Sequence, residues 1–321
     1  MKNILVLFGR TGKPLAPVQD QKYRESYEKL YALAEKRGLL LSRSSLDWYD
    51  EEKRIFEQTL TYNGTGWVVR KNIVPNFIYD RSKPSLISHP SKVLLAREFP
   101  LLNDPGFTLS AGSKLQVSRL IPEFSKPYTL VNSRDELKKT LGEIISSKVV
   151  VKNDRGSGGE SVVIAEREKL LQLDITFPLL VQEFVDSSHG IPGITKSYHD
   201  LRLVFINDKL IYSYIREPKK GSLLANVAQG GSMTIIEPSR LPETLTPAIV
   251  AVQKAFSKYP EKEYTIDFIF DEDGRPWILE MNTMPGIYFA LGQEEWQEKY
   301  FSALLDFFDT NARESSPENK K

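Results

Sequence analysis

Two carboxylates and an amide interrupt an otherwise apolar β pattern near the C-terminal end of the chain. The stretch YTIDFIFDEDGRPWILEMNTMPG, residues 264–286, contains Asp267, Glu280 and Asn282. Between its two apolar runs, Asp273 and Gly274 are typical of a two-residue type I′ turn, so the stretch is predicted to form a β-hairpin. With this turn, Asp267 lies directly opposite Glu280 on the neighbouring strand.

The same register predicts one apolar and one polar face, because side chains alternate along a strand. The apolar face would hold Ile266, Phe268, Phe270, Trp277, Leu279 and Met281. On the polar face, two opposed carboxylates destabilise the strand pair unless a cation lies between them. Carboxylate and amide oxygens suit Mg²⁺, which commonly bridges carboxylates and substrate phosphates. The hairpin alone leaves a second interpretation open, a solvated strand face whose acids repel each other weakly in water.

A glycine-rich segment could bind phosphate groups. In VVVKNDRGSGGESVVIA, residues 149–165, a predicted strand ends at Lys152 and a loop with three glycines follows. Glycines allow backbone N–H groups to converge on an anion, and lysine adds a positive charge. Such a loop is by itself a weak signal and is often only a mobile turn.

Two arginines follow on β-rich segments. A turn at residues 207–209 would let Arg202 and Arg216 project near each other from adjacent strands, and Asn226 follows in LLANVAQGGS. Either arginine alone could form a structural ion pair. Two arginines, a lysine, a glycine loop and an acidic hairpin together are what a polyphosphate and its Mg²⁺ require.

The composition sets the limits for the whole chain. Its 321 residues are 40% hydrophobic and 26% charged, which is ordinary for a globular protein, and the net charge of +1 does not point to nucleic acid or a membrane surface. The absence of cysteine excludes disulfides and thiolate sites. Because the N-terminal apolar run is too short for a signal peptide and no run reaches the length of a membrane span, a cytoplasmic location is expected.

The first part of the chain has the pattern of a small α/β domain. A strand at residues 4–8, a helix that includes Tyr27 to Ala34, and strands at LLLS, WVV and NFIYD follow one another. A further helix is predicted at residues 247–259. FGRTGKP after the first strand lacks the spacing of a P-loop, so a tight turn is expected there. Arg10 and Lys13 in this turn are weaker candidates to face an anionic substrate.

These motifs resemble the ATP-grasp superfamily of carboxylate–amine ligases. Over residues 103–288 the most similar branch is that of glutathione synthetase and the ribosomal-protein glutamate ligases. ILEMNTMPG is similar to its Glu-x-Asn-x-x-Pro-Gly element, and VVVKNDRGSGG to its lysine and mobile glycine-rich lid. DLRLVF and REPKKGSLLANVAQGGS resemble its Asp-x-Arg strand and its Arg-x-Pro…Asn-x-x-x-Gly-Gly segment.

The resemblance implies an α/β (α+β) protein with an ATP-grasp fold and an N-terminal Rossmann-like pre-domain. The implied division is a pre-domain at 1–105, a small lobe with the lid at 106–180, a C-terminal lobe with the Mg²⁺ site at 181–308, and a disordered tail at 309–321. It also implies ATP and two Mg²⁺ ions, for which Mn²⁺ could substitute. The implied metal ligands are Asp267, Glu280 and Asn282. The implied catalytic residues are Arg202, Arg216 and Asn226. The implied ATP-binding residues are Lys114, Lys152, Gly156, Ser157, Gly158, Gly159, Glu183, Phe184 and Val185.

The implied reaction is amide or peptide bond formation through an acyl phosphate, with ADP and phosphate as products. The expected substrates are a small-molecule carboxylate and an amine, which would be an amino acid or a peptide. No nucleic-acid or membrane partner is expected, and a homo-oligomer remains open. Two alternatives are an ATP-grasp-type small-molecule kinase and a non-catalytic ATP-binding regulatory module.

The chain departs from the superfamily at one position of interest. Many relatives have an arginine two residues before the residue equivalent to Asn226, whereas this chain has Leu224. A substrate carboxylate that relatives hold there must be held otherwise here, or be absent. His199, beside Asp200, is a weak candidate for a catalytic base, because a single histidine in a loop is usually solvated.

Overall fold

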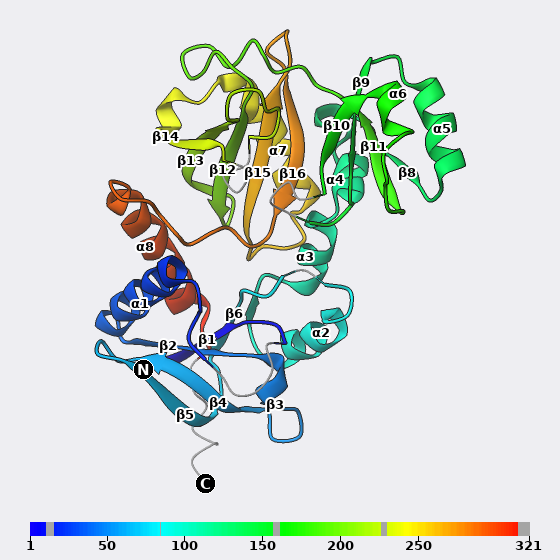
Figure 1. Cartoon of the computed structure of the whole chain (residues 1–321). Coiled ribbons are helices and arrows are strands. Elements are labelled where there is room, and N and C mark those ends of the chain that lie inside the picture. Colours follow the sequence, from blue (N-terminus) through cyan, green and yellow to red (C-terminus); the bar gives the residue numbers. More distant parts are fainter. Residues whose placement is uncertain (11–15, 84, 157–160, 226–229, 314–321) are drawn as a thin grey trace. The chain divides into compact units, whose positions relative to one another are not determined.

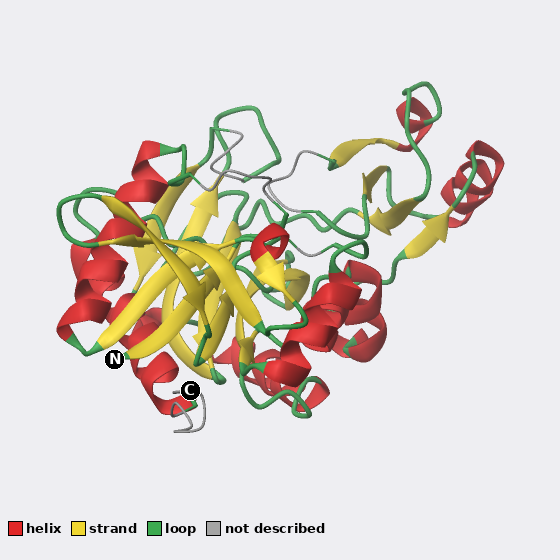
Figure 2. Ribbon diagram, turned by 90° about the horizontal axis from the view of Figure 1, so that it is seen from below, coloured by secondary structure: helices red, strands yellow, loops and turns green. Residues whose placement is uncertain are grey.

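The protein is described by a computed structural model over residues 1–10, 16–83, 85–156, 161–225 and 230–313. The chain divides into two compact units (Figure 1). The first consists of Met1–Leu109, Glu261–Glu263 and Met284–Lys321, and the second of Ser110–Pro260 and Tyr264–Thr283. Both units combine strands with helices (Figure 2).

The first unit is built on a seven-stranded sheet with the order β3-β4-β2-β1-β6-β7, in which β5 pairs with β4. Its centre is parallel, because β1 pairs in parallel with β2 and β6, and β6 pairs in parallel with β7. The strands are β1 Lys2–Leu7, β2 Leu39–Ser44, β3 Tyr49–Asp50, β4 Ile55–Tyr62, β5 Trp67–Ile73, β6 Phe77–Asp80 and β7 Leu101–Leu102. The helices are α1 Gln21–Lys36, α2 His89–Glu98, α8 Glu294–Asn311 and most of α3 Pro105–Ala111.

Helix α1 shows why the predicted elements form where they do. The Asp20 side chain accepts a hydrogen bond from the Tyr23 N–H and caps the first turn, and Gly38 adopts a φ of +75° just beyond the end. The helix buries residues at helical spacing, among them Tyr27, Leu30 and Ala34. The helix predicted for this part of the sequence is therefore confirmed.

The second unit contains two antiparallel sheets. The smaller sheet has the order β10-β9-β11-β8 and the larger one β14-β13-β12-β15-β16. Their strands are β8 Thr129–Val131, β9 Lys148–Lys152, β10 Val163–Glu166, β11 Leu179–Glu183, β12 Asp200–Ile206, β13 Lys209–Glu217, β14 Ser232–Ile236, β15 Glu263–Phe270 and β16 Pro276–Asn282. The helices are α4 Lys114–Leu120, α5 Arg134–Glu143, α6 Arg167–Leu170 and α7 Thr246–Ala255. Leu137 and Leu141 of α5 and Leu170 of α6 pack with Val149 and Val151 of β9 in the core of the smaller sheet.

The hairpin of β15 and β16 pairs Asp267 with Glu280, as the sequence predicts, but its turn differs from the prediction. Asp271 and Arg275 close a three-residue loop in which Gly274 has a φ of +74°, so Phe270 pairs with Pro276 rather than with Trp277. A β-bulge then offsets this shift, because the pairing changes by one residue between Asp267 and Phe268.

The predicted composition of the apolar face is therefore wrong at two positions. Trp277 pairs with Ile269, and Leu279 is the extra residue of the bulge. Leu279 lines a pocket together with Ile269 and Glu280, on the side that was predicted to carry the acidic residues. Ile278, paired with Phe268, takes the buried position instead and is 2% exposed.

Residues 284–308, which the sequence placed in the C-terminal lobe, group with the first unit. Helix α8 also extends to Asn311, into the predicted tail, and residues 314–321 lie outside the described part of the chain. Within the described residues, no helix is both long and apolar enough to cross a membrane.

Candidate active site

Two arginines converge on Asp267 in the second unit. The Arg202 Nε donates to Asp267 Oδ1 at 2.6 Å and its Nη2 pairs with Oδ2, while the Arg216 Nη2 donates to Oδ2 at 2.7 Å. Burial alone would raise the pKa of Asp267, but the charges of Arg202 and Arg216 outweigh it and hold that pKa below its usual value. Asp267 is therefore a buried, ionised carboxylate, and the predicted proximity of the two arginines is confirmed.

Asp200 is the second carboxylate of this cluster. It pairs across β12 and β13 with Arg216, whose Nη2 forms an ion pair with Asp200 Oδ2. Its other oxygen, Oδ1, is buried and has no hydrogen-bond partner among the described residues. Burial raises the pKa of Asp200 despite the attraction of Arg216, and the charge of Asp267 adds to the rise.

Side-chain cations also flank Glu280. The Lys114 Nζ lies 3.3 Å from Glu280 Oε2, and the Arg202 Nη2 lies 3.8 Å from Oε1. Lys114 also donates to the Gly156 carbonyl at 3.0 Å, and the Asn282 Nδ2 is 3.3 Å from Glu280 Oε1. The repulsion between the paired carboxylates is thus relieved by the protein's own lysine and arginine, which the hairpin pattern alone did not reveal.

The predicted metal ligands fit Mg²⁺ in their donor chemistry, since they offer carboxylate and amide oxygens. Both oxygens of Asp267 accept from arginines, whereas Glu280 and Asn282 are partly exposed and lie beside each other. Glu280 and Asn282 are consequently the residues best placed to hold the ion. Among the residues that the structure describes, no group of three or more His, Cys, Asp and Glu side chains is arranged to hold a metal ion.

A pocket of about 120 Å³ lies beside these groups and is formed by both sheets of the second unit. Val150 of β9 and Ile164 of β10 line it from the smaller sheet, and Ile269 and Leu279 line it from the larger one. The residues predicted to bind adenine, Glu183, Phe184 and Val185, belong to its wall, as do Lys114, Lys152, Asp200 and Glu280. The pocket therefore has apolar walls suited to a flat base and a polar part with two lysines.

Lys152 ends β9, as predicted, and is only 6% exposed. Burial lowers the pKa of Lys152 to about 8, although the charges of Glu280 and Asp200 favour its protonated form. Its Nζ lies 4.8 Å from the centre of the Tyr128 ring. A buried ammonium that lines a pocket and forms no ion pair with the described carboxylates is a suitable partner for a phosphate group.

Comparison with known proteins identifies the family of the chain. The model of the RimK-like ATP-grasp domain matches residues 116–292, which is more than half of the chain. The chain belongs to the RimK-like ATP-grasp family. The predicted assignment to the ATP-grasp carboxylate–amine ligases is therefore confirmed.

Relatives and a solved structure are similar to the chain over most of its length. A probable alpha-L-glutamate ligase 1 of Shewanella denitrificans is 24% identical over 75% of this chain and 81% of its own. A probable alpha-L-glutamate ligase of Nitrosococcus oceani is 27% identical over 67% of this chain and 68% of its own. The crystal structure of D-alanyl-alanine synthetase A from Vibrio cholerae aligns with a TM-score of 0.65 at 15% identity, over 97% of this chain and 98% of its own. That likeness shows the ATP-grasp fold.

Several predicted site residues cannot be placed in this ATP-grasp site. Ser157, Gly158, Gly159 and Asn226 lie outside the described residues, as does Lys13. Gly156 is described, and its carbonyl accepts the bond from Lys114. In the first unit, Arg10 forms an ion pair with Asp47 at 3.1 Å.

His199 does not fit the role of a catalytic base, and the expectation that it is solvated is wrong. It is 3% exposed; its Nδ1 lies 3.0 Å from the Ser197 carbonyl and its Nε2 accepts from the Phe270 N–H at 3.1 Å. Burial lowers the pKa of His199, so the ring is neutral with its proton on Nδ1. Both nitrogens are thus engaged by the backbone.

Two contacts of the ATP-grasp site were not predicted. Asp154, two residues after Lys152, accepts from the Ser113 Oγ at 2.8 Å and from the Leu115 N–H at 2.9 Å, so it joins the start of the glycine-rich segment to α4. Tyr128 lies beside Lys152 and donates to the Leu279 carbonyl at 3.2 Å. Both contacts join segments that are far apart in the sequence, so no local sequence pattern predicts them. Leu224, the position of departure, lines the pocket.

Proposed function

We propose that the protein joins a small-molecule carboxylate to the amine of an amino acid or peptide, using the γ-phosphate of ATP to activate the carboxylate. The observation that carries this proposal is the placement of Lys114, Lys152 and Glu280 on the wall of one pocket that is also lined by apolar side chains of both sheets, among them Ile164 and Leu279. ATP requires this combination, because its base is flat and largely apolar while its triphosphate is strongly anionic.

The pocket suggests how ATP binds. The adenine would lie between Ile164 and Leu279 and would form hydrogen bonds with main-chain groups of residues 183–185. The phosphates would extend toward Lys152 and Lys114. Mg²⁺, held by Glu280 and Asn282, would neutralise charge on the phosphate oxygens when bound. We propose two Mg²⁺ ions, as in the sequence-based expectation. Asp267 would bind one of them after it gives up a contact with an arginine.

The chain's own residues can support an acyl-phosphate mechanism. The substrate carboxylate oxygen forms a bond to the γ-phosphorus while the bond to the β,γ-bridging oxygen breaks, which yields ADP and an acyl phosphate. The amine then attacks the acyl carbon, loses a proton and expels inorganic phosphate. A carboxylate needs no deprotonation, and this agrees with the backbone contacts that occupy both nitrogens of His199. Arg202 and Arg216 add positive charge beside the reacting groups.

The substrate pair can be narrowed by comparison. Because the relatives from Shewanella denitrificans and Nitrosococcus oceani are named probable alpha-L-glutamate ligases, glutamate is the first amino acid to test. Leu223, Leu224 and Ala225 give the pocket an apolar stretch where many relatives have an arginine. We propose that the part of the substrate that reaches this stretch carries no carboxylate.

A trapping experiment tests the proposal. The protein is incubated with ATP, Mg²⁺, hydroxylamine and a panel of carboxylates, and ADP and hydroxamate are measured together. We expect ADP and hydroxamate in equal amounts, and only with certain carboxylates. Neither product should form in Lys152→Met. A stable phosphate ester without hydroxamate would identify a kinase instead. ATP that is bound but never consumed across a broad panel of acids and amines would identify a regulatory module.

A further inference from the structure

We propose that Tyr128 is a positioning residue, which holds Lys152 and the bulge beside Glu280 in one fixed arrangement. The inference rests on the proposed function, because it assigns Lys152 to a phosphate and Glu280 to the metal. Tyr128 does not line the pocket, but it contacts two residues that do, Lys152 and Leu279. It would therefore act through these neighbours.

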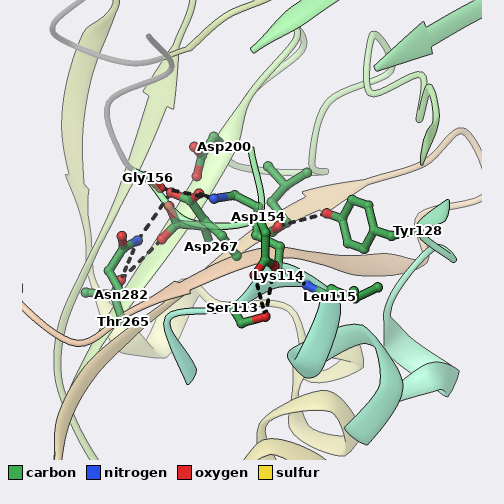
Figure 3. Close-up of polar contacts among 12 residues, drawn as sticks. Ser113, Lys114, Leu115, Tyr128, Asp154, Gly156, Asp200, Thr265, Asp267 and Asn282 are labelled. Atoms are coloured by element: carbon green, nitrogen blue, oxygen red, sulfur yellow. Dashed lines mark hydrogen bonds and ion pairs between the residues drawn. The ribbon is translucent and has the colours of Figure 1, made fainter. Parts of the chain in front are cut away.

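The hydroxyl group of Tyr128 holds the hairpin. It donates to the Leu279 carbonyl at 3.2 Å (Figure 3), and Leu279 is the extra residue of the β-bulge, directly before Glu280. A bulged residue is not paired in the strand ladder, and a buried carbonyl without a donor is costly. Burial raises the pKa of Tyr128, so its hydroxyl group keeps its proton and remains a donor. The bond thus fixes the backbone that directs the Glu280 side chain.

The ring of Tyr128 holds the lysine. The Lys152 Nζ lies 4.8 Å from the ring centre, where the negative face of the ring attracts a cation. Lys152 is buried, so little water competes for its charge. The neighbouring backbone is also anchored, because the Gln182 Nε2 donates to the Lys126 carbonyl at 3.0 Å. One side chain therefore places a group for the phosphate and a group for the metal on the same pocket wall.

Two variants separate the two contacts of Tyr128. Tyr128→Phe keeps the ring and removes the bond to Leu279, whereas Tyr128→Leu removes both. ATP affinity is measured by calorimetry in EDTA, and the half-saturating Mg²⁺ concentration is measured by ADP release in the presence of the carboxylate. We expect Tyr128→Phe to bind ATP in EDTA within about twofold of the unmodified protein but to need about fivefold more Mg²⁺. We expect Tyr128→Leu to lose about tenfold in ATP affinity in EDTA as well.

Tyr62→Phe is the matched control. It also removes a tyrosine hydroxyl group that donates to a backbone carbonyl, that of Gly64 at 3.1 Å, but in the first unit. It should change neither quantity. If the unmodified protein binds ATP and Tyr128→Phe has the same Mg²⁺ requirement, the inference is overturned while the proposed function stands. If the unmodified protein binds no ATP, the proposed function and this inference both fail.

Discussion

At Lys152, two environments act on one ammonium group in opposite directions. Burial lowers its pKa to about 8, whereas Glu280 and Asp200 favour the charged form. A lysine with a lowered pKa loses its proton as the pH rises through that value, so its attraction for phosphate is present below pH 8 and lost above it. We expect ATP affinity to fall by up to about tenfold for each unit above pH 8.

The comparison with Lys152→Arg tests this explanation, because arginine keeps its charge throughout this range. ATP dissociation constants between pH 7 and pH 9.5 should rise for the unmodified protein and stay level for the arginine variant. Equal decline in both proteins would assign the pH dependence to another group.

Glu280 is the residue that should set the requirement for Mg²⁺. Glu280→Gln preserves the shape of the side chain but removes its charge. The half-saturating Mg²⁺ concentration should therefore rise about tenfold or more, because even the loss of a residue that only supports a metal ligand lowers metal affinity by about this factor. Glu272→Gln, at an exposed position in the turn, is the control. An unaltered Mg²⁺ titration in Glu280→Gln would refute its assignment as a ligand. Urea denaturation of the same variant would report the separate loss of the ion pair with Lys114.

Individual site residues could be predicted from the sequence where a charged side chain occurs in a segment that is otherwise apolar. Carboxylates in an apolar hairpin and a lysine at the end of a strand stand out without any structure. Tyr128 and Asp154 do not, because a tyrosine before a strand and an aspartate in a glycine-rich loop are ordinary there. Their importance comes from contacts with residues 151 and 41 positions away in the sequence.

At the scale of elements, the turn between β15 and β16 depends on one carboxylate. Asp271 accepts from the Arg275 N–H at 2.9 Å, from the Asp273 N–H at 3.1 Å and from the Trp277 Nε1 at 2.8 Å. Asp271→Ala should lower the free energy of unfolding by about 2–3 kcal/mol, because it leaves these donors without their acceptor. Urea denaturation measures the loss. Asp273→Ala, at an exposed position of the same turn, should cost less than about 0.5 kcal/mol. Equal losses of unfolding free energy in the two variants would show that the hydrogen bonds of Asp271 do not stabilise the turn.

The hairpin also shows how far a sequence predicts an element. Its two strands, the presence of a turn between them and the pairing of Asp267 with Glu280 were predicted correctly. The length of the turn and the bulge were not, because Asp-Gly suits a three-residue loop as well as a two-residue one. Since no local signal marked Leu279 as an extra residue, its place in the pocket could not be foreseen.

At the scale of the whole molecule, the first unit contains a buried polar cluster around Glu263, which is 1% exposed. Tyr79 donates to it at 3.0 Å, Tyr300 also donates to it, and the Arg81 Nη1 lies 3.7 Å away. Glu263→Ala would leave the charge of the buried Arg81 without this carboxylate, which should cost about 3–5 kcal/mol of unfolding free energy. Thermal and urea denaturation should show the loss, whereas Glu261→Ala, at an exposed position, should be nearly neutral. Unchanged stability in Glu263→Ala would show that the cluster is not important for stability.

The division into units could be predicted less well than the elements. No helix was predicted where α8 lies, and no local sequence pattern states which sheet a helix covers. The structure places Phe307 and Phe308 against Phe77 of β6, with ring centres 5.8 and 5.6 Å apart. The helix therefore belongs to the sheet formed by the start of the chain, although it follows the last strand of the second unit.

The three-residue turn and the bulge have a consequence for the way this hairpin can change over time. In this sequence, the longer turn without the bulge would place Asp267 opposite Leu279, and Glu280 would point into the apolar core. The residues that pair between the turn and the bulge nevertheless keep their partners when one residue is lost from either place. A descendant that loses one residue from the turn, or Leu279 itself, therefore keeps Asp267 opposite Glu280. Single deletions in this hairpin should be inherited at these two places rather than among the paired residues between them.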